Sequence, residues 1–158
     1  MIVAATGHRP NSIFYKNLNG YQIETKTKLR WFIIDVLKKL NPSVVISGMA
    51  LGFDTGIAEA AIELEIPLWA YVPFKGQESM WPQHTQIEYK ELLNKATKVN
   101  IISPGEYSAE KMHIRNKFLV DDCELLIALY NGSKIGGTAH CVRYAEMIKC
   151  ETKNVWND

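Results

Sequence analysis

Short apolar runs alternate along the chain with longer stretches in which apolar residues recur every three or four positions. The first pattern is typical of buried strands, and the second of helices with one buried face. Strands are predicted at residues 2–6, 43–47, 68–72, 99–102 and 125–130, with a short edge strand at 154–156. Helices are predicted at residues 22–40, 84–96, 109–120 and 137–149, and in the Ala-rich stretch that ends near Glu65.

This order of elements predicts an α/β fold, a Rossmann-like open and mostly parallel sheet with helices on both faces. The chain has 158 residues, which fits a single domain over residues 1–158. Apolar types make up 47% of the residues and charged types 22%, so the chain is predicted to bury a core and not to be disordered.

Several classes of protein are disfavoured by what the sequence does not contain. It has no apolar stretch of the roughly 18 residues that a membrane helix needs, and no signal-peptide pattern, so we expect a cytoplasmic protein that does not bind membranes. Three cysteines without a CxxC pair predict reduced thiols. The four histidines lack the spacing of a zinc site, and we expect neither a metal nor a resident cofactor.

The charge balance is close to neutral, with 18 basic and 17 acidic residues and a net charge of +1. Contacts with the phosphate backbone of a nucleic acid depend on positive charge. The balance therefore predicts that nucleic acid is not a partner.

In open parallel sheets, ligands bind at the carboxyl ends of the strands, and the unusual residues of this chain follow strands. The first strand leads into Thr6, Gly7 and Arg9, where an arginine in a rigid turn can contact phosphate. The second leads into a loop whose backbone can approach a ligand and whose acid can accept from a ribose hydroxyl. This loop contributes Gly48, Met49, Gly52 and Asp54. The alternative is that the glycines form tight turns and that Asp54 caps a helix.

A second glycine loop follows the strand at 125–130. Gly136, Gly137 and Thr138 open the last predicted helix, whose amides can hold a phosphate. Neither GxGxxG nor GxxxxGK[ST] is present, which disfavours the commonest dinucleotide and ATP sites. Two glycine loops at one edge of a sheet nevertheless predict a nucleotide site.

Other candidate ligand residues lie in a helix and in an irregular loop. Arg115 can pair with a phosphate, and Asn116 with an adenine edge or a ribose hydroxyl. We expect an alanine variant of Arg115 to bind ligand more weakly and to melt at nearly the wild-type temperature. Phe74 and Trp81 can stack on a base or cover the sheet edge; covering or a dimer contact is preferred, and Trp81 alone is kept as a ligand candidate.

Four segments together resemble the SLOG superfamily, which unites the Smf/DprA proteins with the LOG phosphoribohydrolases, and are most similar to its small YpsA-like branch. The segments are TGHRP at 6–10, GMALGFD at 48–54, MHIRNKFLVDDCELLIAL at 112–129 and GGT at 136–138. The resemblance covers nearly the whole chain. It implies a Rossmann-like fold, a nucleotide or nucleotide-derived ligand held by the two glycine loops and the Arg-Asn segment, and a homodimer or higher homo-oligomer.

The resemblance also bears on activity. LOG enzymes cleave a nucleoside 5′-monophosphate with a PGGxGTxxE motif, but here Thr138 is followed by Ala139, His140 and Cys141, with no acid. We therefore expect a protein that binds an ADP-ribose-like or cyclic nucleotide signal without turnover, as a sensor or as a sequestering protein of phage counter-defence if a phage encodes it. The alternative is a LOG-like N-glycosidase that uses a substitute acid such as Asp54 or Glu146.

Overall fold

The computed structural model describes residues 1–13, 16–18, 21–23 and 26–156. In this part of the chain, strands and helices alternate as the apolar pattern predicts. The strands are β1 (Ile2–Gly7), β2 (Lys16–Leu18), β3 (Tyr21–Ile23), β4 (Val44–Ser47), β5 (Leu68–Val72), β6 (Lys98–Ile101), β7 (Leu125–Leu129) and β8 (Glu151–Asn154). The helices are α1 (Pro10–Ile13), α2 (Lys26–Leu40), α3 (Phe53–Glu63), α4 (Gln83–Lys95), α5 (Ala109–Asp121) and α6 (Gly137–Met147).

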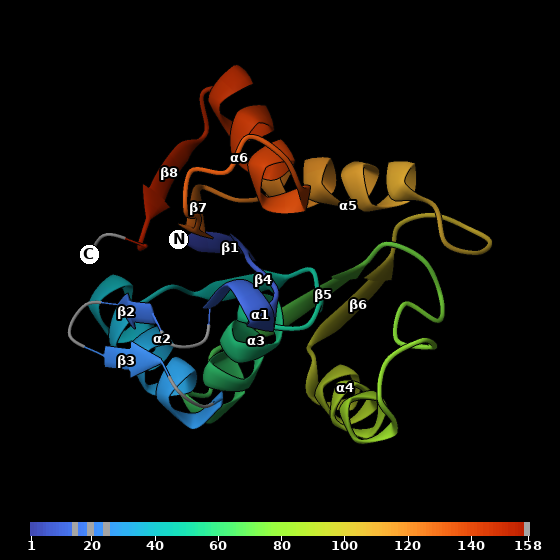
Figure 1. Ribbon diagram of the computed structural model, residues 1–158, viewed down its shortest axis with the longest axis horizontal. Coiled ribbons are helices and arrows are strands. Elements are labelled where there is room, and N and C mark those ends of the chain that lie inside the picture. The colour runs from blue at the N-terminus through green and yellow to red at the C-terminus, as the bar shows by residue number, and fades with distance from the viewer. Residues whose placement is uncertain (14–15, 19–20, 24–25, 157–158) are drawn as a thin grey trace.

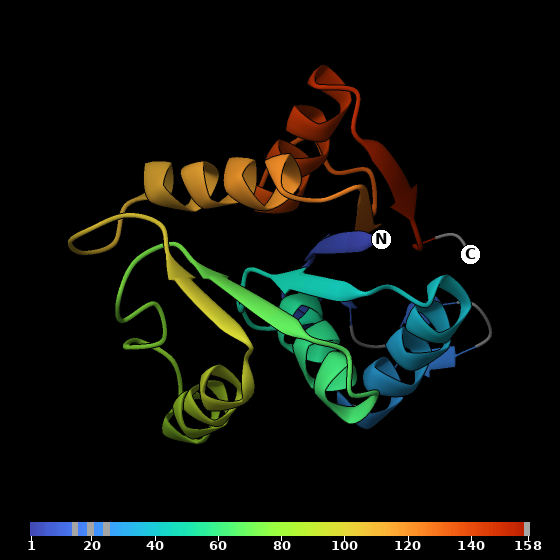
Figure 2. The same ribbon diagram turned by 180° about the vertical axis from the view of Figure 1, so that it is seen from behind.

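The main sheet is six-stranded with the order β6-β5-β4-β1-β7-β8, and each neighbouring pair is parallel. The predicted Rossmann-like architecture is confirmed. Successive side chains of a strand point to opposite faces. Val3 and Ala5 of β1 accordingly belong to a core cluster with α2, α3 and α4, whereas Ala4 belongs to a second cluster with α5 and α6. The two groups of helices lie on opposite faces of the sheet (Figures 1 and 2).

Three elements differ from the prediction. A helix was predicted from residue 22, but 21–23 pair with 16–18 as a two-stranded antiparallel sheet, and α2 begins at Lys26. The short helix α1 was not predicted. The edge strand β8 lies at Glu151–Asn154 and not at 154–156, because its mostly exposed polar residues lack the apolar pattern of a buried strand.

The path of the chain places three loops at one edge of the sheet. β1 lies between β4 and β7, so the carboxyl ends of these three parallel strands are neighbours. The helix after β4 covers one face, and the helix after β7 covers the other (Figure 1). A crevice opens where successive connections diverge in this way. No described helix combines the length and the apolarity that crossing a membrane requires.

Candidate functional site

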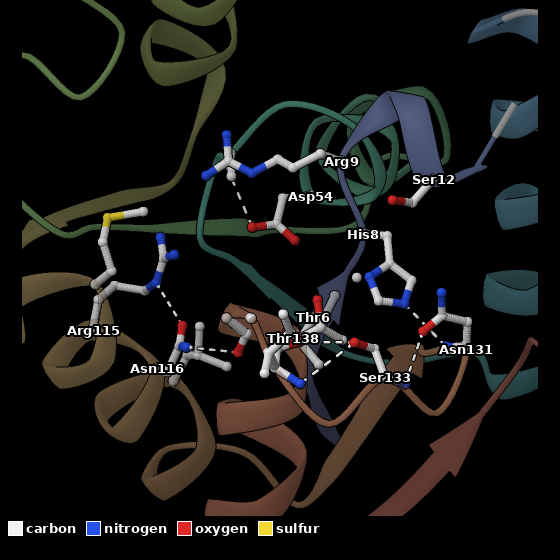
Figure 3. A pocket seen from close by; sticks show the side chains of 18 of the residues that line it. Thr6, His8, Arg9, Ser12, Asp54, Arg115, Asn116, Asn131, Ser133 and Thr138 are labelled. Atoms are coloured by element: carbon white, nitrogen blue, oxygen red, sulfur yellow. Dashed lines mark hydrogen bonds between the residues drawn. The ribbon is translucent and has the colours of Figure 1, made fainter. Parts of the chain in front are cut away.

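A cavity of about 310 Å³, here called the rim cavity, opens at the carboxyl end of β1. The loops after β1, β4 and β7 form its walls together with α5, and their polar side chains converge on it (Figure 3). Its volume is at the small end of the roughly 300–1,000 Å³ usual for small-molecule sites. The predicted ligand residues that line it are Thr6, Gly7, Arg9, Asp54, Arg115, Asn116, Gly136, Gly137 and Thr138.

Three predicted ligand residues of the loop after β4, Gly48, Met49 and Gly52, are not among the residues that line the cavity. Met49 is fully buried in the core with φ +64°. Gly48 has no room for a side chain, because an added Cβ would lie 2.4 Å from Nη1 of Arg115. An added Cβ at Gly52 would lie 2.5 Å from the carbonyl oxygen of His8. These glycines permit close packing within the protein.

Several amides of this first glycine loop, residues 48–52, and of the following turn of α3 donate within the protein. The amide of Met49 donates to Oγ of Ser47 at 3.1 Å, and that of Phe53 donates to the carbonyl of His8 at 3.2 Å. The amide of Ala50 donates to Oδ2 of Asp54 at 3.4 Å. From this segment, Ala50 of the loop and Asp54 of α3 line the rim cavity, and the amides of Met49, Ala50 and Phe53 are engaged within the protein.

The second glycine loop, residues 131–138, is built differently. Gly136 caps α6 at φ +104° without a side-chain hydrogen bond to the helix. A Cβ added at Gly136 or Gly137 would meet no atom within 4 Å. Within the described residues, no acceptor pairs with the amides of Gly137 and Thr138, as expected for the first turn of an uncapped helix. These donors and the partial positive charge of the helix end suit an anion.

Arg115 is only 5% exposed and forms part of the wall from α5. Its Nη1 donates to the carbonyl oxygens of Gly48 at 2.5 Å and Tyr71 at 3.3 Å, and its Nε donates to Oδ1 of Asn116 at 3.0 Å. Asn116 in turn donates to the carbonyl of Gly137 at 3.2 Å. The pair therefore links α5 to both glycine loops. Because Arg115 supports the fold as well as the cavity, we now expect its removal to lower the melting temperature, in place of the nearly unchanged value expected from the sequence.

Asp54 supplies a buried carboxyl to the same wall. It is 7% exposed, and its Oδ1 has no hydrogen-bond partner among the described residues. Burial raises the pKa of Asp54, and the positive charges of Arg115 and Arg9 oppose that rise. Arg9, in contrast, is an exposed residue of the loop after β1. One buried and one exposed arginine therefore line the cavity. The carboxyl group of Asp54, which has one oxygen without a hydrogen-bond partner, lies close to both (Figure 3).

Residues that the sequence reasoning did not select complete the wall, chiefly His8, Asn131 and Ser133. Nε2 of His8 accepts from the amide of Asn131 at 3.0 Å, and Oδ1 of Asn131 accepts from the amide of Ser133 at 3.0 Å. Burial lowers the pKa of His8, so the ring accepts this bond as a neutral imidazole. His8 therefore ties the loop after β1 to the second glycine loop. The sequence signal that could have identified His8 is its position directly after Gly7, in the loop that follows the first strand.

A cysteine nucleophile finds no support at this site. Cys141 is fully buried and is not part of the cavity lining, and burial raises its pKa to about 12. The thiolate, which is the nucleophilic form, is therefore scarce at neutral pH. His140 does not serve as its base, since its ring stacks on that of His113 with 3.8 Å between centroids.

Comparison with known proteins assigns the family. A model of the YspA SLOG family, YpsA, matches residues 3–156. The chain belongs to this family. Two relatives match most of its length. The SPbeta prophage-derived protein YoqJ of Bacillus subtilis (strain 168) is 33% identical over 144 residues, which cover 81% of this chain and 84% of YoqJ. A UPF0398 protein of Bacillus cereus (strain B4264) is 29% identical over 156 residues, covering 92% of this chain and 82% of the relative.

Solved structures confirm the fold of this SLOG protein. DNA processing protein A (DprA) of Streptococcus pneumoniae superposes with a TM-score of 0.67 at 19% identity, covering 95% of this chain and 48% of that protein. DprA of Helicobacter pylori gives a TM-score of 0.63 at 18% identity, covering 96% of this chain and 63% of that protein. The chain thus spans about half of the first protein's length and less than two thirds of the second's.

The structural neighbours correct one expectation. The H. pylori protein is described by its mode of binding single-stranded DNA. The prediction that nucleic acid is not a partner is therefore wrong in its reasoning, because it took the net charge of +1 as decisive. Net charge describes the field of the whole surface, whereas a strand can be held by a few local cations and by stacking.

Proposed function

We propose that the rim cavity binds the phosphate and ribose of a nucleotide derivative and releases the molecule unchanged. The observation that carries this proposal is the open start of α6, where the amides of Gly137 and Thr138 face a cavity that Arg9 and Arg115 also line. A phosphate on those amides would lie at the positive end of a helix and near two cations. Asp54, with one oxygen unpartnered, would accept from a ribose hydroxyl.

Binding without turnover is supported by the carboxyl groups at the site. Within the described lining, Asp54 is the only carboxylate, and Glu146 of α6 is not part of that lining. Cleavage of an N-glycosidic bond needs groups that stabilise an oxocarbenium-like centre and protonate the leaving base, which most glycosidases supply as a pair of acids. One buried acid beside two arginines is better suited to recognition.

Calorimetry and product analysis together test this proposal. The probes are the four ribonucleoside 5′-monophosphates and ADP-ribose, each titrated into the full chain and then recovered from denatured protein. We expect saturable binding of at least one probe and its recovery intact. Free base released over many turnovers would favour the alternative, a nucleoside 5′-monophosphate N-glycosidase. Binding by none of the probes would contradict the assignment of the cavity.

Single-stranded DNA is a second candidate ligand, favoured by the fold shared with H. pylori DprA. The strand would place one backbone phosphate at the start of α6, which uses the same chemistry as a free nucleotide. Fluorescence anisotropy with a labelled oligonucleotide at about 50 mM and about 200 mM salt would reveal backbone contacts as a salt-dependent affinity. Binding that is unaffected by excess nucleoside monophosphate would place the strand elsewhere.

Three finer elements extend the first proposal. The ligand would be an ADP-ribose-like or cyclic nucleotide, the protein would act as a homodimer, and it would sense or sequester a signal. The prophage-derived relative YoqJ supports a phage setting for such sequestration. Light scattering coupled to size exclusion would test the dimer, and mass spectrometry of molecules released from freshly purified protein would test the ligand class.

A further inference from the structure

A second hollow of about 360 Å³, here called the aromatic groove, adjoins the rim cavity. The loop between β5 and α4 and the loop between β6 and α5 form it, and both lie on the same side of the molecule (Figure 1). Its lining residues are Arg9, Phe74, Gly76, Gln77, Ser79, Met80, Trp81, Tyr107 and Met112. Arg9 and Met112 line the rim cavity as well, so the two hollows share a wall.

The side chains of the groove suit a flat apolar group. Phe74 is buried and meets Tyr107 edge to face, with 5.9 Å between the ring centroids. Tyr107 is itself 71% exposed and Met80 is 92% exposed, although both are large apolar residues. Trp81 packs edge to face on Tyr89, with 5.3 Å between the ring centroids, and it also lines the groove. Exposed aromatic side chains of this kind provide stacking surfaces for bases.

A polar group at the base of the groove adds a second, independent observation. Gln77 is 8% exposed, and its Nε2 donates to the carbonyl of Gly48 at 3.3 Å and to the hydroxyl oxygen of Tyr89 at 3.4 Å. Its Oε1 has no partner among the described residues. Buried polar atoms are nearly always paired. Gln77 lines the groove, so a ligand donor that reaches its Oε1 would satisfy this unpaired acceptor. The amino edge of a base is such a donor.

We propose that the aromatic groove receives a second nucleobase, so that the ligand contains two nucleoside units joined through phosphate. The inference rests on the proposed function of the rim cavity. One unit would occupy the rim cavity, Arg9 at the shared wall would face the linking phosphate, and the other base would stack in the groove against Tyr107. A small dinucleotide and a single strand share this chemistry.

Affinity measurements with matched probes test the inference. The probes are the four ribonucleoside 5′-monophosphates, the four 5′-phosphorylated homodinucleotides and the corresponding pentanucleotides. We expect the best dinucleotide to bind on the order of tenfold more tightly than its monophosphate, the scale of one stacked base. A further gain for the pentanucleotide would identify a strand as the source, and equal affinity would identify a small dinucleotide.

Two exposed side chains provide the variants, with a matched control for one of them. Tyr107→Ala should remove most of the gain for the dinucleotide and leave monophosphate affinity within about twofold. Met80→Ala should remove a smaller part of the gain. Met147→Ala, at a methionine of α6 that is 71% exposed and outside both hollows, should leave both affinities unchanged.

The outcomes separate this inference from the proposal on which it rests. Monophosphates that bind as tightly as dinucleotides would overturn the second base site and leave the rim cavity intact. A dinucleotide gain that survives both Tyr107→Ala and Met80→Ala would overturn the groove as its location. Loss of monophosphate binding in Tyr107→Ala would overturn the division between the two hollows. Failure of every probe to bind the wild-type chain would overturn the proposed function as well.

Discussion

The two glycine loops follow β4 and β7, the two strands that flank β1 in the sheet, yet their glycines have different roles. In the first loop, Gly48 and Gly52 lie where an added Cβ would contact Arg115 or the backbone of His8 within 2.5 Å. In the second loop, Gly136 and Gly137 face open space, and α6 begins without a side-chain cap. The first loop therefore serves packing, and the second presents its backbone to the rim cavity.

This difference shows what a glycine in a loop after a strand indicates. The residue permits close approach, but the approaching group can be a neighbouring part of the same chain or a ligand. The amides of Met49 and Ala50 in the first loop donate to Ser47 and Asp54, and that of Phe53, directly after it, donates to the carbonyl of His8. Changes in the first loop should therefore lower stability, and changes in the second should lower affinity.

The largest expected effect is that of Gly52→Ala on folding. Gly52 has φ +92° and ψ −126°, a conformation that side chains disfavour, and its added Cβ would lie 2.5 Å from a backbone oxygen. Strain and overpacking together should lower the free energy of unfolding by about 4 kcal/mol. Urea denaturation measures the change. Gly137→Ala is the matched control and should be nearly neutral, since its Cβ meets nothing within 4 Å.

Arg115→Ala should affect both stability and binding. The variant leaves the carbonyls of Gly48 and Tyr71 without a buried donor and removes positive charge near Asp54. We expect a loss of about 3 kcal/mol in the free energy of unfolding, on the scale of charged hydrogen bonds. Adding Asp54→Asn should restore part of the lost free energy of unfolding. The double variant no longer buries a carboxyl group whose neighbouring cation has been removed. A wild-type melting temperature in the single variant would show that Arg115 does not support the first loop.

Gly137→Val tests the second loop through binding. A valine side chain would project into the open space where we place the phosphate, while the fold has room for it. We expect the affinity for the best nucleoside 5′-monophosphate to fall about tenfold or more, or at least about 1.4 kcal/mol. The melting temperature should change little. Unchanged affinity by calorimetry would remove the start of α6 from the site.

Asp54→Asn should weaken ligand binding without lowering the stability of the fold. The pKa of Asp54 is raised by burial, so its contribution to stability is complete below the ordinary carboxyl pKa and is lost as the pH rises through the folded pKa. The amide keeps an acceptor for the amide of Ala50. We expect an equal or higher melting temperature at pH 7 and a several-fold weaker affinity for the best nucleoside 5′-monophosphate. A destabilised variant would contradict the burial argument.

The smallest expected effect is a pH dependence from His8. Its pKa in the folded protein is lowered by burial, so the unfolded chain takes up the proton first as the pH falls. The contribution of His8 to stability is complete above its ordinary pKa of 6.5 and is lost as the pH falls through the folded pKa. The melting temperature should therefore drop below about pH 6. The decline should be shallower in His8→Asn; an identical slope would assign it to other groups, such as His140, whose pKa burial also lowers.

Much of the fold follows from periodicity because the strands of the sheet interior are short apolar runs. β7, for example, is buried at every position and is unmistakable in the sequence. The edge strand β8 was predicted at the wrong residues because its residues are polar and mostly exposed. The antiparallel pair of β2 and β3 was not predicted, because three-residue strands carry almost no periodic signal.

The candidate site was predictable to the extent that it follows the carboxyl ends of strands. Thr6, Asp54 and Thr138 line one cavity although they are far apart in sequence, as the topology implies. The different roles of Gly48 and Gly137 depend on what the missing side chain would meet, and that is a property of packing. The role of His8 depends on a bond to Asn131, which local sequence does not encode.

An amide spectrum of the isotopically labelled chain, recorded during titration with the tightest-binding nucleoside 5′-monophosphate, tests whether the start of α6 holds the phosphate. We expect the amide signals of Gly137 and Thr138 to shift most and to saturate with the ligand. Those of Met49 and Phe53, which already donate within the protein, should move little. Saturation of binding with the Gly137 and Thr138 signals unmoved would show that the phosphate does not bind at the start of α6.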